Sequence, residues 1–158
     1  MQYAERGSLR TKVVIDTSSL ISAIFSSKQN TSGKRLYDAI LKDEIIVFTC
    51  DVLFGEMDRV LNTEPKFRHA EKPYIRSRKD MLYEHVRFED MSGLEHNPAM
   101  LIRIGNDWYV IAVAKKRNVD CIVAMDNGIR EAVKSEPGCD GMRCLTIQEF
   151  VKILSRQA

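Results

Sequence analysis

Runs of consecutive hydrophobic residues recur along the chain and predict a parallel β-sheet. Residues 12–16 and 121–125 are rich in apolar side chains that do not alternate with polar ones, which is typical of strands buried on both faces. Residues 45–48 predict a further strand, and residues 143–145 predict a short edge strand. The sequence therefore predicts four strands, of which two are buried on both faces.

Helical patterns separate these strands. Residues 17–19 can cap a helix after the first strand, and the capping box from Thr146 to Glu149 opens a last helix over residues 147–155. Because strands alternate with helices, we predict an α/β protein with helices packed around a parallel sheet. The other predicted helices cover residues 32–41, 52–61, 107–117 and 129–133, with residues 65–88 helical in pattern but broken at Pro73, and residues 137–141 forming a turn.

The size and composition of the chain are those of one ordinary globular domain. It has 158 residues, of which 44% are hydrophobic and 29% charged, which argues against disorder and against a coiled coil. No apolar run reaches the roughly 18–20 residues that cross a bilayer, and the polar N-terminus lacks the apolar centre of a signal peptide. We therefore expect a cytoplasmic protein without membrane contact, with a polar extension over residues 1–11 and a single domain over residues 12–158.

The cysteines and histidines predict neither a disulfide framework nor a metal site of the His/Cys type. The four cysteines have no CxxC spacing, and Cys121 in an apolar run is expected to be a buried thiol. A disulfide between Cys139 and Cys144 would require an oxidising compartment. The three histidines form no HExxH motif. The net charge of +2 means that any nucleic-acid surface must be local.

Four acidic residues occupy positions that predict a functional site. Asp16 and Asp126 each follow an apolar strand, and the carboxyl ends of parallel strands form the edge at which such sheets carry their sites. Glu56 and Asp107 lie in predicted helices on the side of the apolar residues, where an acid is desolvated unless it has a partner. We therefore expect these four carboxyl groups to converge at one edge of the sheet.

Each of these acids also has a simpler structural interpretation. Asp16 can be a helix N-cap, and Asp126 can be a turn residue before Asn and Gly. Glu56 can reach outward or pair with Arg59, and Asp107 suits the first turn of a helix because of the helix dipole. For each residue taken alone, these alternatives stay open.

A bound cation would explain the four acids together. Converging carboxylates cannot all stay ionised without a cation, because like charges raise each other's pKa. An all-oxygen set without His or Cys suits a hard ion such as Mg²⁺ or Mn²⁺. Such an ion can activate water and neutralise phosphate charge, so the predicted chemistry is hydrolysis of a phosphodiester.

Four segments of the chain, in this order, resemble the motifs of the PIN-domain family of metal-dependent ribonucleases. The resemblance covers nearly the whole chain. It implies a three-layer α/β/α sandwich with a mostly parallel central sheet, and a homodimer that cleaves RNA. It also implies the toxin of a toxin–antitoxin pair, with an antitoxin protein as partner. The segments are residues 13–23 (VVIDTSSLISA), 51–56 (DVLFGE), 106–114 (NDWYVIAVA) and 121–126 (CIVAMD).

The resemblance also assigns roles to single residues. Ser18, or Thr17, would orient the attacking water or a phosphate oxygen. The chain departs from the family pattern at Ser18, where Asn is usual, at Ala124, where Ser or Thr is common, and at Cys50, where Ser is usual. Because such neighbours orient metal ligands, the departures leave open a non-catalytic PIN-like domain that binds RNA or a protein. The metal ligands and catalytic acids assigned by the resemblance are Asp16, Glu56, Asp107 and Asp126.

A basic segment over residues 66–79 is the predicted RNA-binding surface. Its cations are interleaved with Phe67 and Tyr74, and cations beside exposed rings suit single-stranded nucleic acid. The alternative is a solvated pair of charged helices, since nearby acids dilute the charge. A second basic patch at residues 115–117 is expected to match a helix dipole, far from the acids. The residues assigned to RNA are Lys66, Arg68, Arg76, Arg78 and Lys79.

Overall fold

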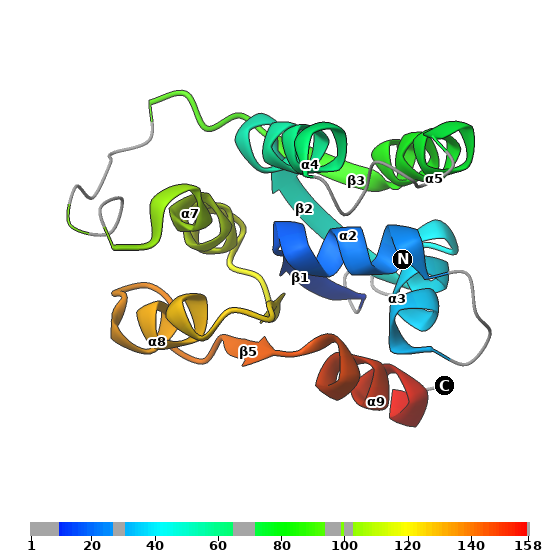
Figure 1. The fold of residues 1–158 in the computed structure, drawn as a ribbon. Helices are drawn as coiled ribbons and strands as arrows, with labels where there is room; N and C mark the ends of the chain where they lie inside the picture. The colour runs from blue at the N-terminus through cyan, green and yellow to red at the C-terminus, as the bar shows by residue number, and fades with distance from the viewer. Residues whose placement is uncertain (1–9, 27–30, 65–71, 94–98, 100–102, 158) are drawn as a thin grey trace, which may run out of the picture.

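A parallel β-sheet forms the centre of the protein (Figure 1). The computed structural model describes residues 10–26, 31–64, 72–93, 99 and 103–157. Within these ranges five strands pair in the order β3-β2-β1-β4-β5, and every pairing is parallel. The strands are β1 (Thr11–Ile15), β2 (Ile45–Cys50), β3 (Val86–Glu89), β4 (Cys121–Val123) and β5 (Arg143–Leu145).

The helices alternate with the strands, as the sequence predicts. The turn over residues 137–141 is present, and the capping box is formed by the N–H of Thr146 donating to Glu149 and the N–H of Glu149 donating to Thr146 Oγ1. Over the described ranges, no helix combines the length and apolar character that crossing a membrane requires. The described helices are α2 (Thr17–Phe25), α3 (Ser32–Leu41), α4 (Asp51–Thr63), α5 (Lys72–His85), α7 (Trp108–Arg117) with the 3-10 turn η2 (Gly105–Asp107) before it, α8 (Asn127–Ser135) and α9 (Ile147–Gln157).

Helices cover both faces of the sheet, so the fold is a three-layer α/β/α sandwich. Side chains of β1 alternate between two hydrophobic cores: Val13 and Ile15 pack with α2, α3 and α9, whereas Val14 packs with α7 and α8. Figure 1 shows α7 and α8 on one side of the sheet and α2, α3 and α9 on the other. The observed layers confirm the predicted fold class.

Several element bounds differ from the sequence prediction, among them those of the charged run at residues 65–88 and of the strand at residues 121–125. The charged run at residues 65–88 predicts helix to its end, but residues 86–89 form the edge strand β3. Only Val86 and Glu89 of β3 are buried, so the strand lacks the continuous apolar run of a central strand. Pro73 lies in the first turn of α5, where its missing N–H costs no bond, and residues 65–71 before it lie outside the described residues. Strand β4 ends two residues before the predicted end at residue 125.

The cysteines are packing residues in this fold. All four are free thiols, and Cys121 is fully buried, as predicted. Burial raises the pKa of the Cys121 thiol to about 12, so the group stays neutral at physiological pH.

The close packing of α2 against α3 depends on Gly33. A β-carbon at this position would overlap Ser26 Oγ and lie 3.1 Å from the carbonyl oxygen of Ser22. We expect Gly33→Ala to lower the free energy of unfolding by about 1–3 kcal/mol, despite the better helix propensity of alanine. The matched control is Gly55→Ala in α4, where a β-carbon meets nothing within 4 Å. Urea unfolding should show this control stabilised by about 0.5–1 kcal/mol, and equal effects at both sites would contradict the packing argument.

Candidate active site at the carboxyl edge of the sheet

Asp16 lies at the point where β1 ends and α2 begins. Its carboxylate is the N-cap of α2, with Oδ1 accepting from the N–H of Ser19 at 2.8 Å and Oδ2 accepting from the N–H of Met125 at 3.3 Å. The residue is only 3% exposed, and this burial raises the pKa of its carboxyl group, while the bonds from Ser19 and Met125 oppose the rise. The N-cap alternative is therefore correct for Asp16, and it also fixes the carboxylate at the edge of the sheet.

Asp126 occupies the equivalent place after β4. It is exposed and is the N-cap of α8, with Oδ1 accepting from the N–H of Gly128 at 2.5 Å. The charge of Asp126 raises the pKa of the Asp16 carboxyl group, which indicates that the two groups lie within electrostatic reach. The two strand-end acids therefore share one edge, as predicted from the apolar runs before them.

Asp107 is the acid whose carboxyl pKa is raised by the charges of all three others. It ends η2, directly before α7, and is half-buried without a side-chain capping bond. Burial raises the pKa of its carboxyl group to about 6, and the charges of Asp126, Asp16 and Glu56 add to the rise in that order. Val110 and Ile111, three and four residues after Asp107, are fully buried, so Asp107 lies at the start of the buried side of α7, as the sequence predicts.

Glu56 has partners for both of its carboxylate oxygens. Oε1 accepts from Arg59 Nη2 at 2.7 Å, and Oε2 accepts from Asn106 Nδ2 at 3.3 Å. The hydrogen bond from Arg59 is the main reason why the pKa of the Glu56 carboxyl group is lowered. The bond from Asn106 joins α4 to the turn that carries Asp107. This is the outward-reaching, Arg59-paired arrangement that the sequence leaves open.

The position of Glu56 on its helix corrects part of the sequence argument. The buried face of α4 is formed by Leu53, Phe54 and Met57, whereas Val52, a predicted member of that face, is 36% exposed. The Glu56 side chain is 26% exposed, so it flanks the core instead of lying on it. The apolar pattern alone did not fix the helix rotation, because α4 contributes to both cores.

The four carboxyl groups are electrostatically coupled, but they do not form a closed metal cage. In the part of the chain that the structure describes, no three His, Cys, Asp or Glu side chains are grouped closely enough to hold a metal ion. The chemistry of the donors fits a hard divalent cation, because all four are carboxylates. Burial raises the pKa of Asp107, and the charges of the other three acids, which a cation would offset, add to the rise.

Asn106 has a contact with one of the acids that the sequence does not indicate. Its amide donates to Glu56, 50 residues earlier. Its only sequence signal is its place directly before Asp107. Ser18 is exposed in the first turn of α2, and the two other departures from the family pattern, Ala124 and Cys50, are buried.

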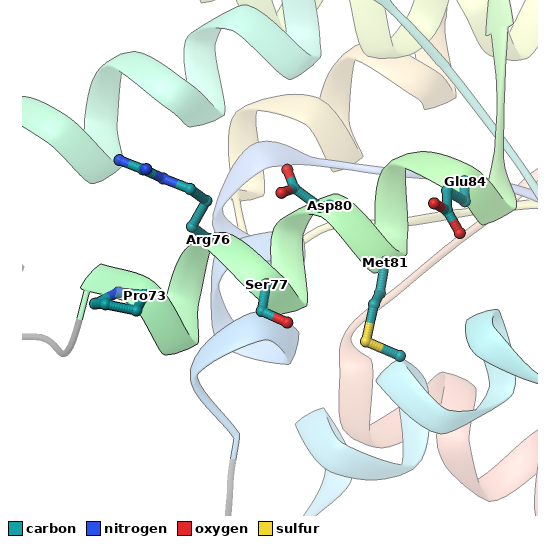
Figure 2. A pocket seen from close by; sticks show the side chains of 6 residues that line it. All are labelled: Pro73, Arg76, Ser77, Asp80, Met81 and Glu84. Atoms are coloured by element: carbon teal, nitrogen blue, oxygen red, sulfur yellow. The ribbon is translucent and has the colours of Figure 1, made fainter.

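The basic segment is divided between internal contacts and a mixed-charge surface. Lys66 and Arg68 lie outside the described residues, and Lys79 forms an ion pair with Asp58 at 2.6 Å. Figure 2 shows Arg76 on α5, beside a hollow of about 440 Å³ whose described lining residues come from this helix. Because the described part of the lining carries one cation and two acids, it is not a uniformly basic surface. The residues that line it are Pro73, Arg76, Ser77, Asp80, Met81 and Glu84.

Arg78 connects α5 to the end of α2. Its Nε donates to the carbonyl oxygen of Ile24 at 2.6 Å, and its Nη2 donates to those of Ala23 at 3.2 Å and Ser26 at 3.0 Å. The guanidinium also lies 3.8 Å from the centroid of the Tyr37 ring. Arg78 thus donates to three carbonyls at the end of α2, of which that of Ala23 also accepts from the N–H of Ser26, and its charge suits the helix dipole.

A structural role for Arg78 predicts a loss of stability on its removal. We expect Arg78→Met to lower the free energy of unfolding by about 2 kcal/mol, since the variant leaves carbonyls without donors. Arg76→Met, the control on the exposed side of the same helix, is expected to change stability by less than about 0.5 kcal/mol. Thermal unfolding of both variants checks this, and equal losses would contradict the capping role.

The cations of the second basic patch are engaged in ion pairs within the fold. Lys115 pairs with Glu136 at 2.8 Å, and both Lys116 and Arg117 pair with the buried Glu89. The patch lies in the last turn of α7, as the helix-dipole interpretation predicts.

A comparison with known protein families identifies the fold. A family model described as the PIN domain matches residues 12–128, which is most of the chain and includes all four acids. Among curated proteins, no sequence matches the chain at a significant level. PIN domains are in general nucleases that act on nucleic acid and use divalent metal ions. With this match and the three-layer parallel fold, the chain belongs to the PIN-domain family.

Proposed function

We propose that this protein is an Mg²⁺- or Mn²⁺-dependent ribonuclease that hydrolyses RNA phosphodiester bonds. The observation that carries the proposal is the raised pKa of Asp107, which arises from burial and from three other carboxylates at the same sheet edge. A PIN domain with mutually repelling acids at that edge has the donors that a hard cation requires.

The proposed roles follow from the place of each side chain. Asp16 and Asp126 would hold the principal ion, with Asp107 and Glu56 contributing directly or through water. When bound, the ion would supply a water of lowered pKa and neutralise phosphate charge. The bonds to Asp16 from Ser19 and Met125 keep its carboxylate in one orientation. Exposed Ser18 would orient the attacking water or a phosphate oxygen.

The test is a cleavage assay on single-stranded RNA with purified protein. We expect cleavage with Mg²⁺ or Mn²⁺ and none when a chelator is in excess. Cleavage that persists in chelator would overturn the metal-dependent mechanism, and the absence of cleavage with every divalent ion would overturn the enzymatic proposal.

A non-catalytic PIN-like binding domain is the second candidate. The observation that favours it is the pairing of both Glu56 oxygens with Arg59 and Asn106, which leaves this acid less available to an ion. Binding of RNA without cleavage, at every metal concentration tested, would support this candidate.

The cellular role that we propose is the toxin of a toxin–antitoxin pair, acting in the cytoplasm as a homodimer. Its support is membership of the PIN-domain family, whose members include such toxins. The test is growth of a bacterial culture after induced expression, which the wild type should arrest and a cleavage-deficient variant should not. Rescue by the product of a neighbouring small gene would identify the antitoxin, and light scattering on the purified protein would test the dimer.

A further inference from the structure

Arg59 is an exposed cation held directly against the candidate site. It lies one turn after Glu56 on α4, and its Nη2 donates to Glu56 Oε1 at 2.7 Å. Its side chain is 58% exposed, so the guanidinium is open to solvent beside the acids. Two other arginines, each four residues along the chain from Asp107 or Asp126, have partners outside the four acids: Arg103 pairs with Glu131, and Arg130 pairs with Glu149.

The Arg59–Glu56 pair is weak enough to exchange. Exposed ion pairs of this kind contribute little to stability because water screens them, so separating the two groups costs little. Glu56 would keep its place without Arg59, because its other oxygen accepts from Asn106 at 3.3 Å. A phosphate can accept two parallel, charge-assisted hydrogen bonds from the planar guanidinium. The Glu56 carboxylate accepts from Arg59 through one oxygen, Oε1.

We propose that Arg59 is a substrate-contacting residue, held at the edge of the acids by Glu56 in the free protein and transferred to a phosphate of bound RNA. The inference rests on the proposed function and adds a residue to it. Arg59 also gives the site a cation of its own, which offsets the repulsion between the four carboxylates and an approaching phosphate backbone.

The experiment measures binding of a fluorescent single-stranded RNA at several salt concentrations, in the cleavage-deficient Asp16→Asn background. Arg59→Gln is expected to weaken binding about fivefold to tenfold. It should also reduce the slope of the logarithm of the binding constant against the logarithm of the salt concentration by about 0.7, the value for the loss of one phosphate contact. Arg59→Lys should keep the slope and restore part of the affinity. The matched control is Arg35→Gln. Arg35 pairs with Glu44 at 2.9 Å, and Glu44 directly precedes β2, at the opposite edge of the sheet.

A second measurement separates substrate contact from a purely structural role. In the otherwise unchanged protein, Mg²⁺ should raise the melting temperature of Arg59→Gln by at least as much as it raises that of the wild type, because Glu56 loses a competing cation. If Arg59→Gln binds RNA like Arg35→Gln while the wild type cleaves RNA, the inference is wrong and the proposed function stands. If the wild type neither binds nor cleaves RNA, the proposed function fails and takes the inference with it.

Discussion

Asp16→Asn is expected to reduce metal-dependent RNA cleavage by roughly a hundredfold or more, because losing a charge at the reacting centre removes several kcal/mol of stabilisation. The substitution keeps the volume of the side chain. Asparagine is as good an N-cap as aspartate, so the bond from the N–H of Ser19 that begins α2 can be retained. The amide can replace only one acceptor oxygen, so the bond from Met125 is the one lost.

Two controls make this result interpretable. Circular dichroism should show that Asp16→Asn remains folded, with a modestly lower melting temperature. Asp38→Asn removes an acid that pairs with Lys34 on α3, and it should cleave RNA like the wild type. Undiminished cleavage by Asp16→Asn would remove Asp16 from the site, and equal losses in both variants would indicate a general charge effect.

The metal-free protein is expected to become more stable when the pH falls from 7 to about 5. The folded pKa of Asp107 is about 6, above its ordinary value of 3.8, so the folded state binds more protons than the unfolded state between these values. The penalty of the charged carboxylate is absent below that window and grows as the pH rises through it. Glu56 has the opposite sign, because its pKa is lowered from 4.5, so the gain should reverse on further acidification.

Divalent metal should remove this pH dependence and stabilise the protein at pH 7. At a hundredfold excess over the dissociation constant, binding to the folded state alone adds about 2.7 kcal/mol. Asp107→Asn should melt at a higher temperature than the wild type without metal, since it loses one repelling charge, and should lose most of the response to metal.

The measurement is thermal unfolding of the wild type, Asp107→Asn and Asp38→Asn, with chelator and with Mg²⁺ or Mn²⁺, from pH 5 to 7. Asp38→Asn should respond like the wild type. If the ion shifts the wild type and Asp107→Asn equally, or shifts neither, the four acids do not bind it.

The central part of the fold was predictable because burial leaves a local record in the sequence. β1 and β2 each contain a continuous apolar run, and β4 consists of one, and such runs can be recognised without knowledge of distant contacts. The edge strand β3 has only four residues, of which Arg87 and Glu89 are charged, so its pattern could not be distinguished from that of the charged helix before it.

The candidate site was predictable to a similar extent. Asp16 and Asp126 could be found from strand ends, and Asp107 from the apolar side of its helix. Contacts across long separations had no such signal: Asn106 reaches Glu56, and Arg78 reaches Ile24 from 54 residues away. Both depend on how packed elements are placed relative to one another, which local periodicity does not encode.

The order of the strands fixes the order in which the site can be completed during synthesis. β1 leaves the ribosome first but lies at the centre of the sheet, between β2 and β4. Val13 pairs with Val47 early, but its other neighbour, Cys121, is translated 108 residues later. Asp16 therefore remains without its bond from Met125, and without the nearby charge of Asp126, until most of the chain exists. A nascent chain that stops before residue 121 can assemble α2, α3 and β2 around β1, but not the paired acids on which the proposed activity depends.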